Sequence, residues 1–424
     1  MTQPPVTPPG RPLVRPGVVR RTAHAALVRV DAAFSRKGPA FKQLAVSWSA
    51  NVAGDTLVAV ALAGTLFFDV PSAEARDKTA LYLLLTLAPF AIVAPVLSAV
   101  FGRFPGAYRA VLTAGAALRG VLAVVMAFGL GTFWLFPIAF VMLVLSRLYG
   151  ISKSSMLPVA LPEPVALVSA NAQLARFGIY AGAGAALVGA GLVQAHSAVA
   201  LAAAALCFAF SAFTGLGLPD PRASVVGAPI GVGPAPSRAA FIQHQRSLRL
   251  SRLATAVVRL LNGFLLALLA FEFKEGGSAL DFSALIGAAG VGFGLASVIS
   301  PWLERHLREE PMVVAALALE AAAAFVAGQF FSLGAAAGLA GAAGLAWGTA
   351  KFGFDGLLQS VVHPAHRGGA FTRAETLFQL AWVVGAVLPV GLPIPAEVGL
   401  AVAGGVALAA QTVFVAGLLI EPHR

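Results

Sequence analysis

The chain has 424 residues, of which 58% are hydrophobic and only 11% are charged, and its mean hydropathy is +0.85. A soluble domain carries about 25% charged residues, so this composition excludes an ordinary soluble protein. The formal net charge is +11, but the basic residues gather in loops and at the N-terminus, where they set membrane topology, so we expect no nucleic-acid partner. The single cysteine, Cys207, excludes a disulfide framework and any cysteine-based metal site.

The apolar residues fall in blocks of about twenty, the length that a helix needs to cross the hydrocarbon core of a membrane. These blocks are continuous rather than alternating, which favours an all-α membrane protein over a β-barrel. In chain order, the twelve predicted spans lie at about 47–68, 80–101, 110–130, 133–156, 168–193, 197–217, 252–273, 282–303, 312–331, 333–356, 373–394 and 396–420.

Pro, Gly and Ser residues from Pro219 to about Ala239 divide these spans six and six. We therefore expect a basic N-terminal tail (1–46), an N-terminal six-helix bundle (47–218), a cytoplasmic linker (219–251) and a C-terminal six-helix bundle (252–424). Basic residues are concentrated in the tail, in the linker and in the loops after spans two and eight, whereas the opposite loops are mixed or acidic. The positive-inside rule then predicts a multi-pass protein of the cell membrane with both termini in the cytoplasm.

The two halves share a weak internal repeat at an offset of about 202–207 residues. A lone charge interrupts the third span of each half, and a Gly next to an Asp or Asn lies in the first span of each half. Repeats of this kind build many transporters, in which the substrate site lies between the halves near the membrane midplane. The matching positions are Gly102-Arg103 with Glu304-Arg305, Arg119 with Glu320, and Gly54-Asp55 with Asn262-Gly263.

These features resemble the major facilitator superfamily of secondary transporters, over about residues 45–420. That family marks the loop between its second and third helices with the pattern Gly-x-x-x-Asp-Arg-x-Gly-Arg-Arg. Here the loop reads Ser98-Ala-Val-Phe-Gly102-Arg103-Phe-Pro105-Gly106-Ala-Tyr-Arg109, with Gly102 in place of the Asp. The second-half copy keeps an acid in Glu304-Arg305. The resemblance implies two pseudo-symmetric six-helix bundles and a cytoplasmic gate.

A narrower resemblance is to the macrolide-efflux and enterobactin-exporter branch of that superfamily. It is carried by Ser49-Ala-Asn51-Val-Ala-Gly54-Asp55, by Arg119 inside the third span, and by Leu157-Pro158 and Ala170-Asn171. This resemblance implies export of a small amphipathic or hydrophobic molecule, drug-like or siderophore-like. Lysophospholipid flippases of the same superfamily are similar enough to remain an alternative.

Ionisable residues inside predicted spans are the candidates for chemistry, since each costs at least about 2.5–3.5 kcal/mol at the membrane centre. Asp55 is the first candidate, with Asn51 on the same helical face, and we expect it to be the proton-coupling carboxylate. The alternative is a fixed ion pair between Asp55 and Arg119, and the two roles are compatible. Arg119 could also hold an anionic substrate, because its charge is permanent.

The remaining candidates fall into two groups. We expect the substrate cavity to include Asn51, Arg119, Arg176, Arg259, Asn262 and Glu320. We expect the cytoplasmic gate to include Arg103, Arg109, Glu304, Arg305, Lys351 and Asp355.

Other sequence patterns limit the alternatives. His363-x-x-His366 lacks a further ligand, so we expect no metal, and the absence of a Gly-x-x-x-x-Gly-Lys-Ser/Thr pattern argues against ATP binding by that route. The charges are scattered over many spans, which argues against an enzyme. An intramembrane enzyme or a scaffold without transport is the alternative from another class of function. Gly290-x-x-x-Gly294 and Gly344-x-x-x-Gly348 predict close helix packing.

Together these features predict a secondary active transporter that works by alternating access and exports its substrate against proton entry. We expect no cofactor, a proton gradient as the energy source, a small-molecule or lipid-like substrate, membrane lipids as surroundings and a monomeric state. The lipid flippase is the alternative within the same fold.

Overall fold

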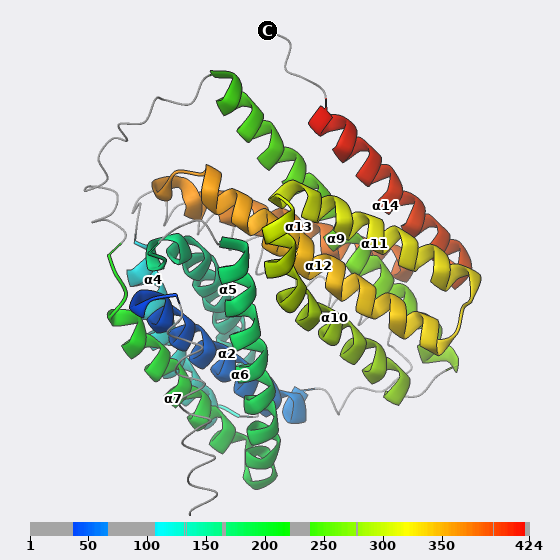
Figure 1. Cartoon of the computed structure of the whole chain (residues 1–424). Helices are drawn as coiled ribbons and strands as arrows, with labels where there is room; N and C mark the ends of the chain where they lie inside the picture. The colour runs from blue at the N-terminus through cyan, green and yellow to red at the C-terminus, as the bar shows by residue number, and fades with distance from the viewer. Residues whose placement is uncertain are drawn as a thin grey trace, which may run out of the picture.

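A computed structural model of the chain describes residues 37–66, 107–130, 132, 134–162, 167–220, 238–276, 279–392 and 394–419. Within these residues all regular secondary structure is helical (Figure 1). The helices are α2 (Pro39–Leu66), α4 (Tyr108–Phe128), α5 (Leu135–Ala160), α6 (Leu167–Ala195), α7 (Ser197–Leu216), α9 (Arg238–Gly276), α10 (Ala279–His306), α11 (Glu309–Gln329), α12 (Leu333–Val361), α13 (Pro364–Gly391) and α14 (Ala396–Leu419).

These helices coincide in order with eleven of the twelve predicted spans. The second predicted span (80–101), Arg103 and the tail up to residue 36 lie outside the described residues. Three helices begin well before the predicted spans: α2 at Pro39 rather than at about 47, α9 at Arg238, inside the predicted linker, and α13 at Pro364 rather than at about 373. In each of these places a segment with polar or basic residues continues the helix beyond its most apolar part, which hydropathy alone does not detect.

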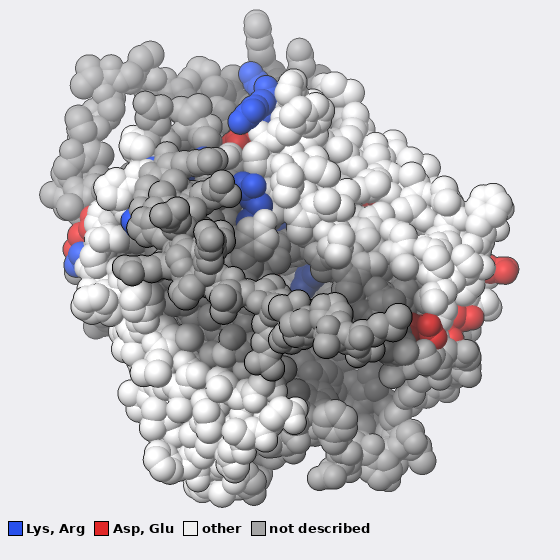
Figure 2. All heavy atoms as spheres, turned by 60° about the horizontal axis from the view of Figure 1, so that its bottom comes forward, with Lys and Arg blue, Asp and Glu red and all other residues white. Residues whose placement is uncertain are grey.

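Among the described residues, ten helices are long and apolar enough to cross a membrane. The described surface that faces the viewer in Figure 2 is largely uncharged, as lipid-facing surface must be. The fold is that of a multi-pass membrane protein.

The helices form two groups that are packed in the same way. In Figure 1, α2 to α7 lie together at the lower left and α9 to α14 at the upper right. In the first group, α2 packs on α6 and α7, and α4 packs on α5 and α7. In the second group, α9 packs on α13 and α14, and α11 packs on α12 and α14. Each described helix of the first half therefore has a counterpart with equivalent neighbours, as the internal sequence repeat predicts.

Glycines bring two helix pairs of the second half into backbone contact. A Cβ atom on Gly344 of α12 would meet the backbone oxygen of Ala289 in α10, and one on Gly385 of α13 would meet that of Leu260 in α9. The predicted packing role is confirmed for Gly344 and Gly348. It is wrong for Gly290 and Gly294, which have no described heavy atom within 4 Å of an added Cβ, because Gly292 lies at the contact instead.

This difference predicts opposite effects of the same substitution on one helix pair. Gly344→Ala should lower the free energy of unfolding by about 1–3 kcal/mol, because the new methyl group overpacks the α10–α12 contact. Gly290→Ala should leave stability equal or raise it by about 0.5–1 kcal/mol, because alanine restricts the unfolded chain and meets no described atom. Thermal unfolding in detergent measures both, and equal losses in the two variants would contradict the packing assignment.

Candidate functional site

The two halves meet through α5 and α6 on one side and α10, α12 and α13 on the other. Hydrogen bonds between the halves gather at one end of the bundle, where α4, α6 and α13 begin and α5, α10 and α12 end. We call this the sealed end.

The clearest of these contacts joins α10 to the start of α6. The Glu304 carboxylate accepts hydrogen bonds from the backbone N–H of Val168, at 3.0 Å, and from that of Ser169, at 2.8 Å. The positive end of the α6 dipole favours this carboxylate, and the two N–H groups have no partner within their own helix. Lys37 lies beside the pair and donates to the Ser169 hydroxyl at 3.3 Å. Burial lowers the pKa of Lys37 below its ordinary value, and the Glu304 charge opposes this shift.

A buried amide relay adds a second contact at the sealed end. Asn171 of α6 donates to the Gln359 side chain of α12 at 2.7 Å, and Gln359 donates to the Ser154 carbonyl of α5 at 2.8 Å. Tyr108 at the start of α4 donates to the Pro364 carbonyl at 3.0 Å and accepts from the Gly368 N–H at 3.1 Å. These bonds connect α4, α5 and α6 with α12 and α13.

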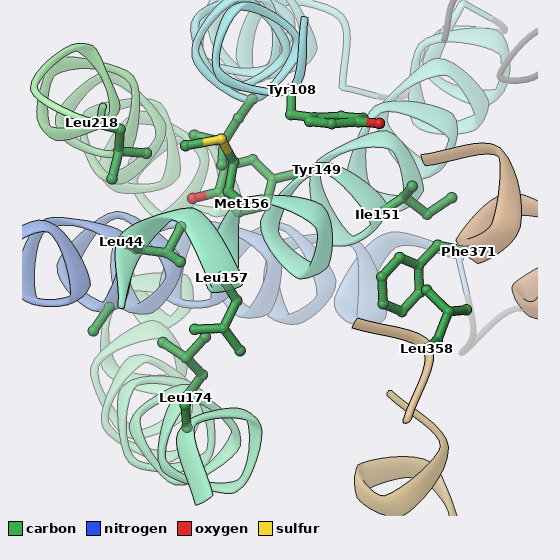
Figure 3. Close-up of a cluster of buried hydrophobic side chains, with 14 of the residues drawn as sticks. Leu44, Tyr108, Tyr149, Ile151, Met156, Leu157, Leu174, Leu218, Leu358 and Phe371 are labelled. Carbon is green, nitrogen blue, oxygen red and sulfur yellow. The ribbon is translucent and has the colours of Figure 1, made fainter. Parts of the chain in front are cut away.

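Apolar side chains fill the space between these polar contacts. Ile151 of α5, Leu358 of α12 and Phe371 of α13 belong to one buried cluster, in which Figure 3 shows Phe371 beside Leu358 with Ile151 facing them. The cluster continues into the first half through Leu44, Tyr149 and Leu157. The sealed end therefore excludes water by apolar packing and is held in register by hydrogen bonds.

The predicted gate residues divide between this seal and other places. Glu304 lies in the seal. Arg109 binds within its own half, to the Leu218 carbonyl at 3.0 Å and to Asp220 at 3.6 Å, and Arg305 is exposed at the end of α10. Lys351 and Asp355 line a cavity beyond the seal rather than joining the halves.

That cavity lies between the halves and has a volume of about 570 Å³. Ser154, Asn171 and Phe371 belong both to its wall and to the seal, so the seal closes one end of it. Helices α2, α5, α6, α10, α12 and α13 contribute to the wall. Its larger apolar residues are Trp48, Ile151, Ile179, Phe293, Trp347 and Phe352. A cavity of this size and lining fits a small organic molecule.

Lys351 connects two carboxylates in the wall of this cavity. Its ammonium lies 2.5 Å from Asp355, four residues along α12, and 2.7 Å from Glu375 of α13. The sequence analysis missed Glu375. Glu375 lies at the start of the predicted span 373–394, two residues after Arg373, so it lacks the isolated position in an apolar run that singled out Glu320.

Three further cations surround the cavity. Arg147 and Lys153 of α5 lie in its wall, and neither was among the predicted site residues. The Lys153 ammonium lies 4.2 Å from the centre of the Trp48 ring. The Arg259 guanidinium of α9 lies 4.5 Å from the Trp347 ring and 5.7 Å from the Trp382 ring. Arg259 therefore contacts the lining residue Trp347, and all six predicted cavity residues lie outside the described wall.

Arg119 is buried inside the first half, where it forms an ion pair with Asp55. Its side chain is 1% exposed, donates to the Asn51 side chain at 2.7 Å and lies 4.1 Å from the Phe208 ring. Asp55 also accepts from the Ser146 hydroxyl at 3.2 Å, and Ser146 lines the cavity. The structure therefore contains the Asp55–Arg119 ion pair that was the alternative to a proton-coupling role for Asp55. Ser146 lies between this pair and the cavity.

The second half carries a related pair at the equivalent position. Asn262 of α9 donates to Glu320 of α11 at 3.2 Å, and Glu320 is 1% exposed. The corresponding first-half pair joins α2 to α4. Each half therefore has a buried polar contact between its first and third spans, and the third-span residue is a cation, Arg119, in one half and an acid, Glu320, in the other. Arg176 lies partly buried on α6, outside the described wall of the cavity.

Comparison with solved structures identifies this architecture. A crystal structure of a bacterial homologue of the iron transporter ferroportin, in an outward-facing state, superposes with a TM-score of 0.65 at 16% identity and covers 89% of this chain and 99% of its own. This chain has the major facilitator fold. The human organic anion transporter MFSD10 has a TM-score of 0.57 at 16% identity, covering 88% and 98% of the two chains. FucP, a major facilitator transporter in the outward conformation, has the same score at 14% identity, covering 88% and 97%.

Relatives closer in sequence are two mycobacterial proteins. An uncharacterised protein of Mycobacterium leprae is 31% identical over 391 residues, and one of Mycobacterium tuberculosis is 39% identical over 147 residues. The matches cover 82% and 32% of this chain. The chain spans 66% of the length of the first relative and 26% of the second. No family model matches the chain.

The Asp55–Arg119 pair yields a stability prediction. Asp55→Asn should destabilise the major facilitator fold by about 3–5 kcal/mol, because it leaves the buried Arg119 charge without its partner. The double variant Asp55→Asn/Arg119→Met should recover most of that loss, since it removes both charges and keeps an apolar side chain against Phe208. Thermal unfolding of the single and double variants in detergent measures this, and a double variant no more stable than Asp55→Asn would contradict the coupling.

Proposed function

We propose that the protein is a secondary transporter that carries a small amphipathic molecule across the membrane by alternating access. The observation that carries this proposal is the cavity between two related halves, closed at one end by contacts that join the halves. Rocking of one half against the other would break those contacts and open the cavity to the opposite side. The likeness to solved major facilitator transporters supports the same mechanism.

The predicted topology gives this conformation a direction. The positive-inside rule places the starts of α4, α6 and α13 in the cytoplasm, so the sealed end is the cytoplasmic end and the conformation is outward-facing. The bacterial ferroportin homologue that superposes best among the structures described above was itself solved in an outward-facing state. We propose that Glu304, the Asn171–Gln359 amide pair and Tyr108 form the cytoplasmic gate.

We further propose that proton entry drives export. Asp55 is the candidate proton site, because protonation would release its ion pair with Arg119, and its bond to Ser146 connects it to the cavity. Glu375 is a second candidate, because its protonation would release Lys351. The export direction is supported by the resemblance of the first span to that of exporters.

Alternating access predicts that locking the sealed end stops transport. In a Cys207→Ser background, Asn171→Cys/Gln359→Cys should be joined by a short bifunctional methanethiosulfonate reagent, since the native side chains are in hydrogen-bond contact. Cross-linking should abolish dye efflux from proteoliposomes, and a reducing agent should restore it. Each single-cysteine variant treated with the same reagent is the control. Undiminished transport in the cross-linked protein would rule out alternating access through this gate.

Proton coupling predicts a proton flux that depends on substrate. In proteoliposomes with an imposed pH gradient, transported compounds from a panel of drugs, siderophores and lysolipids should accelerate dissipation of the gradient. Asp55→Asn should reduce this stimulated flux about tenfold or more, and the stabilised double variant Asp55→Asn/Arg119→Met separates lost coupling from lost stability. Substrate movement without protons in wild type and in both variants would assign Asp55 a structural role and favour a uniporter or a flippase.

A further inference from the structure

We infer that the cavity binds an amphipathic organic anion, with Lys153 of the first half and Arg259 of the second as the groups that recognise its negative charge. The inference rests on the transporter proposed above and gives its substrate a chemical class. The anionic group could belong to a free small molecule or to a lipid headgroup, and the experiment below separates these sources.

The first argument is the balance of charge. Among the described residues that line the cavity, three side chains are cationic and two are anionic, and Arg259 adds a fourth cation against the lining residue Trp347. The cations are Arg147, Lys153, Arg259 and Lys351, and the anions are Asp355 and Glu375. Positive charge in a site of low dielectric is costly, and an anionic ligand offsets it.

The second argument is how these charges are arranged. Both carboxylates lie against Lys351, which accounts for one cation and both acids. Arg147 and Arg259 also interact electrostatically with Glu375, and Lys153 interacts with both acids, at greater range. Lys153 lies on α5 in the first half, and Arg259 lies on α9 in the second. An anion between them would therefore draw the two halves together, as a substrate must in alternating access.

The third argument is the contact that Lys153 and Arg259 make with aromatic rings. Lys153 lies over Trp48, and Arg259 lies between Trp347 and Trp382. An indole face stabilises a cation but leaves its N–H donors available, whereas a bidentate carboxylate would occupy them. Trp48 and Trp347 also line the cavity, so each cation is held at the edge of an apolar surface.

The fourth argument concerns the rest of the ligand. Ile151, Ile179, Phe293 and Phe352 line the cavity beside the two indoles and would bury an apolar body. The volume of about 570 Å³ suits a molecule with one to a few fused rings or a short chain. Charge at one position and apolar surface around it together describe an amphipathic anion.

The test measures equilibrium binding to the full chain in nanodiscs of uncharged lipid, using probes in matched pairs. The pairs are 1-naphthoate with 1-naphthylmethylammonium, and fluorescein with rhodamine 123, so that each pair has the same ring system and opposite charge. Lysophosphatidylglycerol is the anionic lipid probe, and lysophosphatidylcholine, which is zwitterionic and has no net charge, is its matched control. We expect at least one anion to bind ten times more tightly than its partner. Binding of the soluble anions identifies a free molecule as ligand, and binding of only the anionic lysolipid identifies a headgroup.

Variants tie this preference to the two cations. Lys153→Gln and Arg259→Gln should each weaken anion binding about tenfold or more, whereas Lys153→Arg and Arg259→Lys should stay within about threefold of wild type. Arg308→Gln removes an exposed cation at the start of α11 and should leave binding unchanged. Monodisperse elution and an unchanged melting temperature show that each variant is folded. If a Gln variant does not fold, the charge-conserving variants still test the role of the two cations.

Three results would overturn the inference: no anion binds, each cation binds as tightly as its anionic partner, or the two Gln variants bind like wild type. The cross-linking experiment separates this failure from failure of the proposed function. If a cationic or neutral dye is transported and the sealed-end cross-link stops it, the transporter stands and the anion site fails. If anions bind with the expected variant pattern but no transport responds to the cross-link, the site stands and alternating access fails.

Discussion

Most of the charged side chains described inside this fold lie in groups, because a single charge in a membrane interior costs more than one packing contact returns. Lys351 lies between Asp355 and Glu375, and Arg119 is held by Asp55 and Asn51. Cations without a close carboxylate lie against indole rings instead. This constraint decides where helices can meet, since each group takes its members from two or three helices.

The same constraint separates the two ends of the site. At the sealed end the contacts between the halves are amide, hydroxyl and backbone hydrogen bonds around an apolar layer, with Glu304 on the α6 dipole as the charged member. Such contacts are individually modest, about 0.5–1.5 kcal/mol each for neutral groups, so a small change in balance can break them together. In the cavity the charges are denser and not fully neutralised among the described residues. In the proposed mechanism, weak neutral bonds at the sealed end would let the halves separate and rejoin around a ligand in the charged cavity.

The internal repeat explains why these features occur twice in altered form. In each half the first and third spans share a buried polar contact, Asp55 with Arg119 and Asn262 with Glu320. The first-half pair can bind a proton only by breaking an ion pair, whereas the second-half pair contains an acid without a described cationic partner. In the second half, glycines also bring the backbone of α9 close to α13 and that of α10 close to α12. The two halves therefore share a topology and differ in the charge of their buried pairs.

The sequence by itself determined the class of fold, eleven of the spans now seen as helices, their division into two related halves and the presence of isolated charges within them. Hydropathy, Pro and Gly content and repeat spacing carry that information along the chain. Only the tertiary structure decided which charges meet. In the structure Glu375 lies beside Lys351, and Arg147 and Lys153 line the cavity. Arg119 and Glu320 are instead buried inside their own halves. The reason is physical: the face that a helix turns to a cavity depends on how its neighbours pack, and a near-uniform apolar span does not encode that rotation.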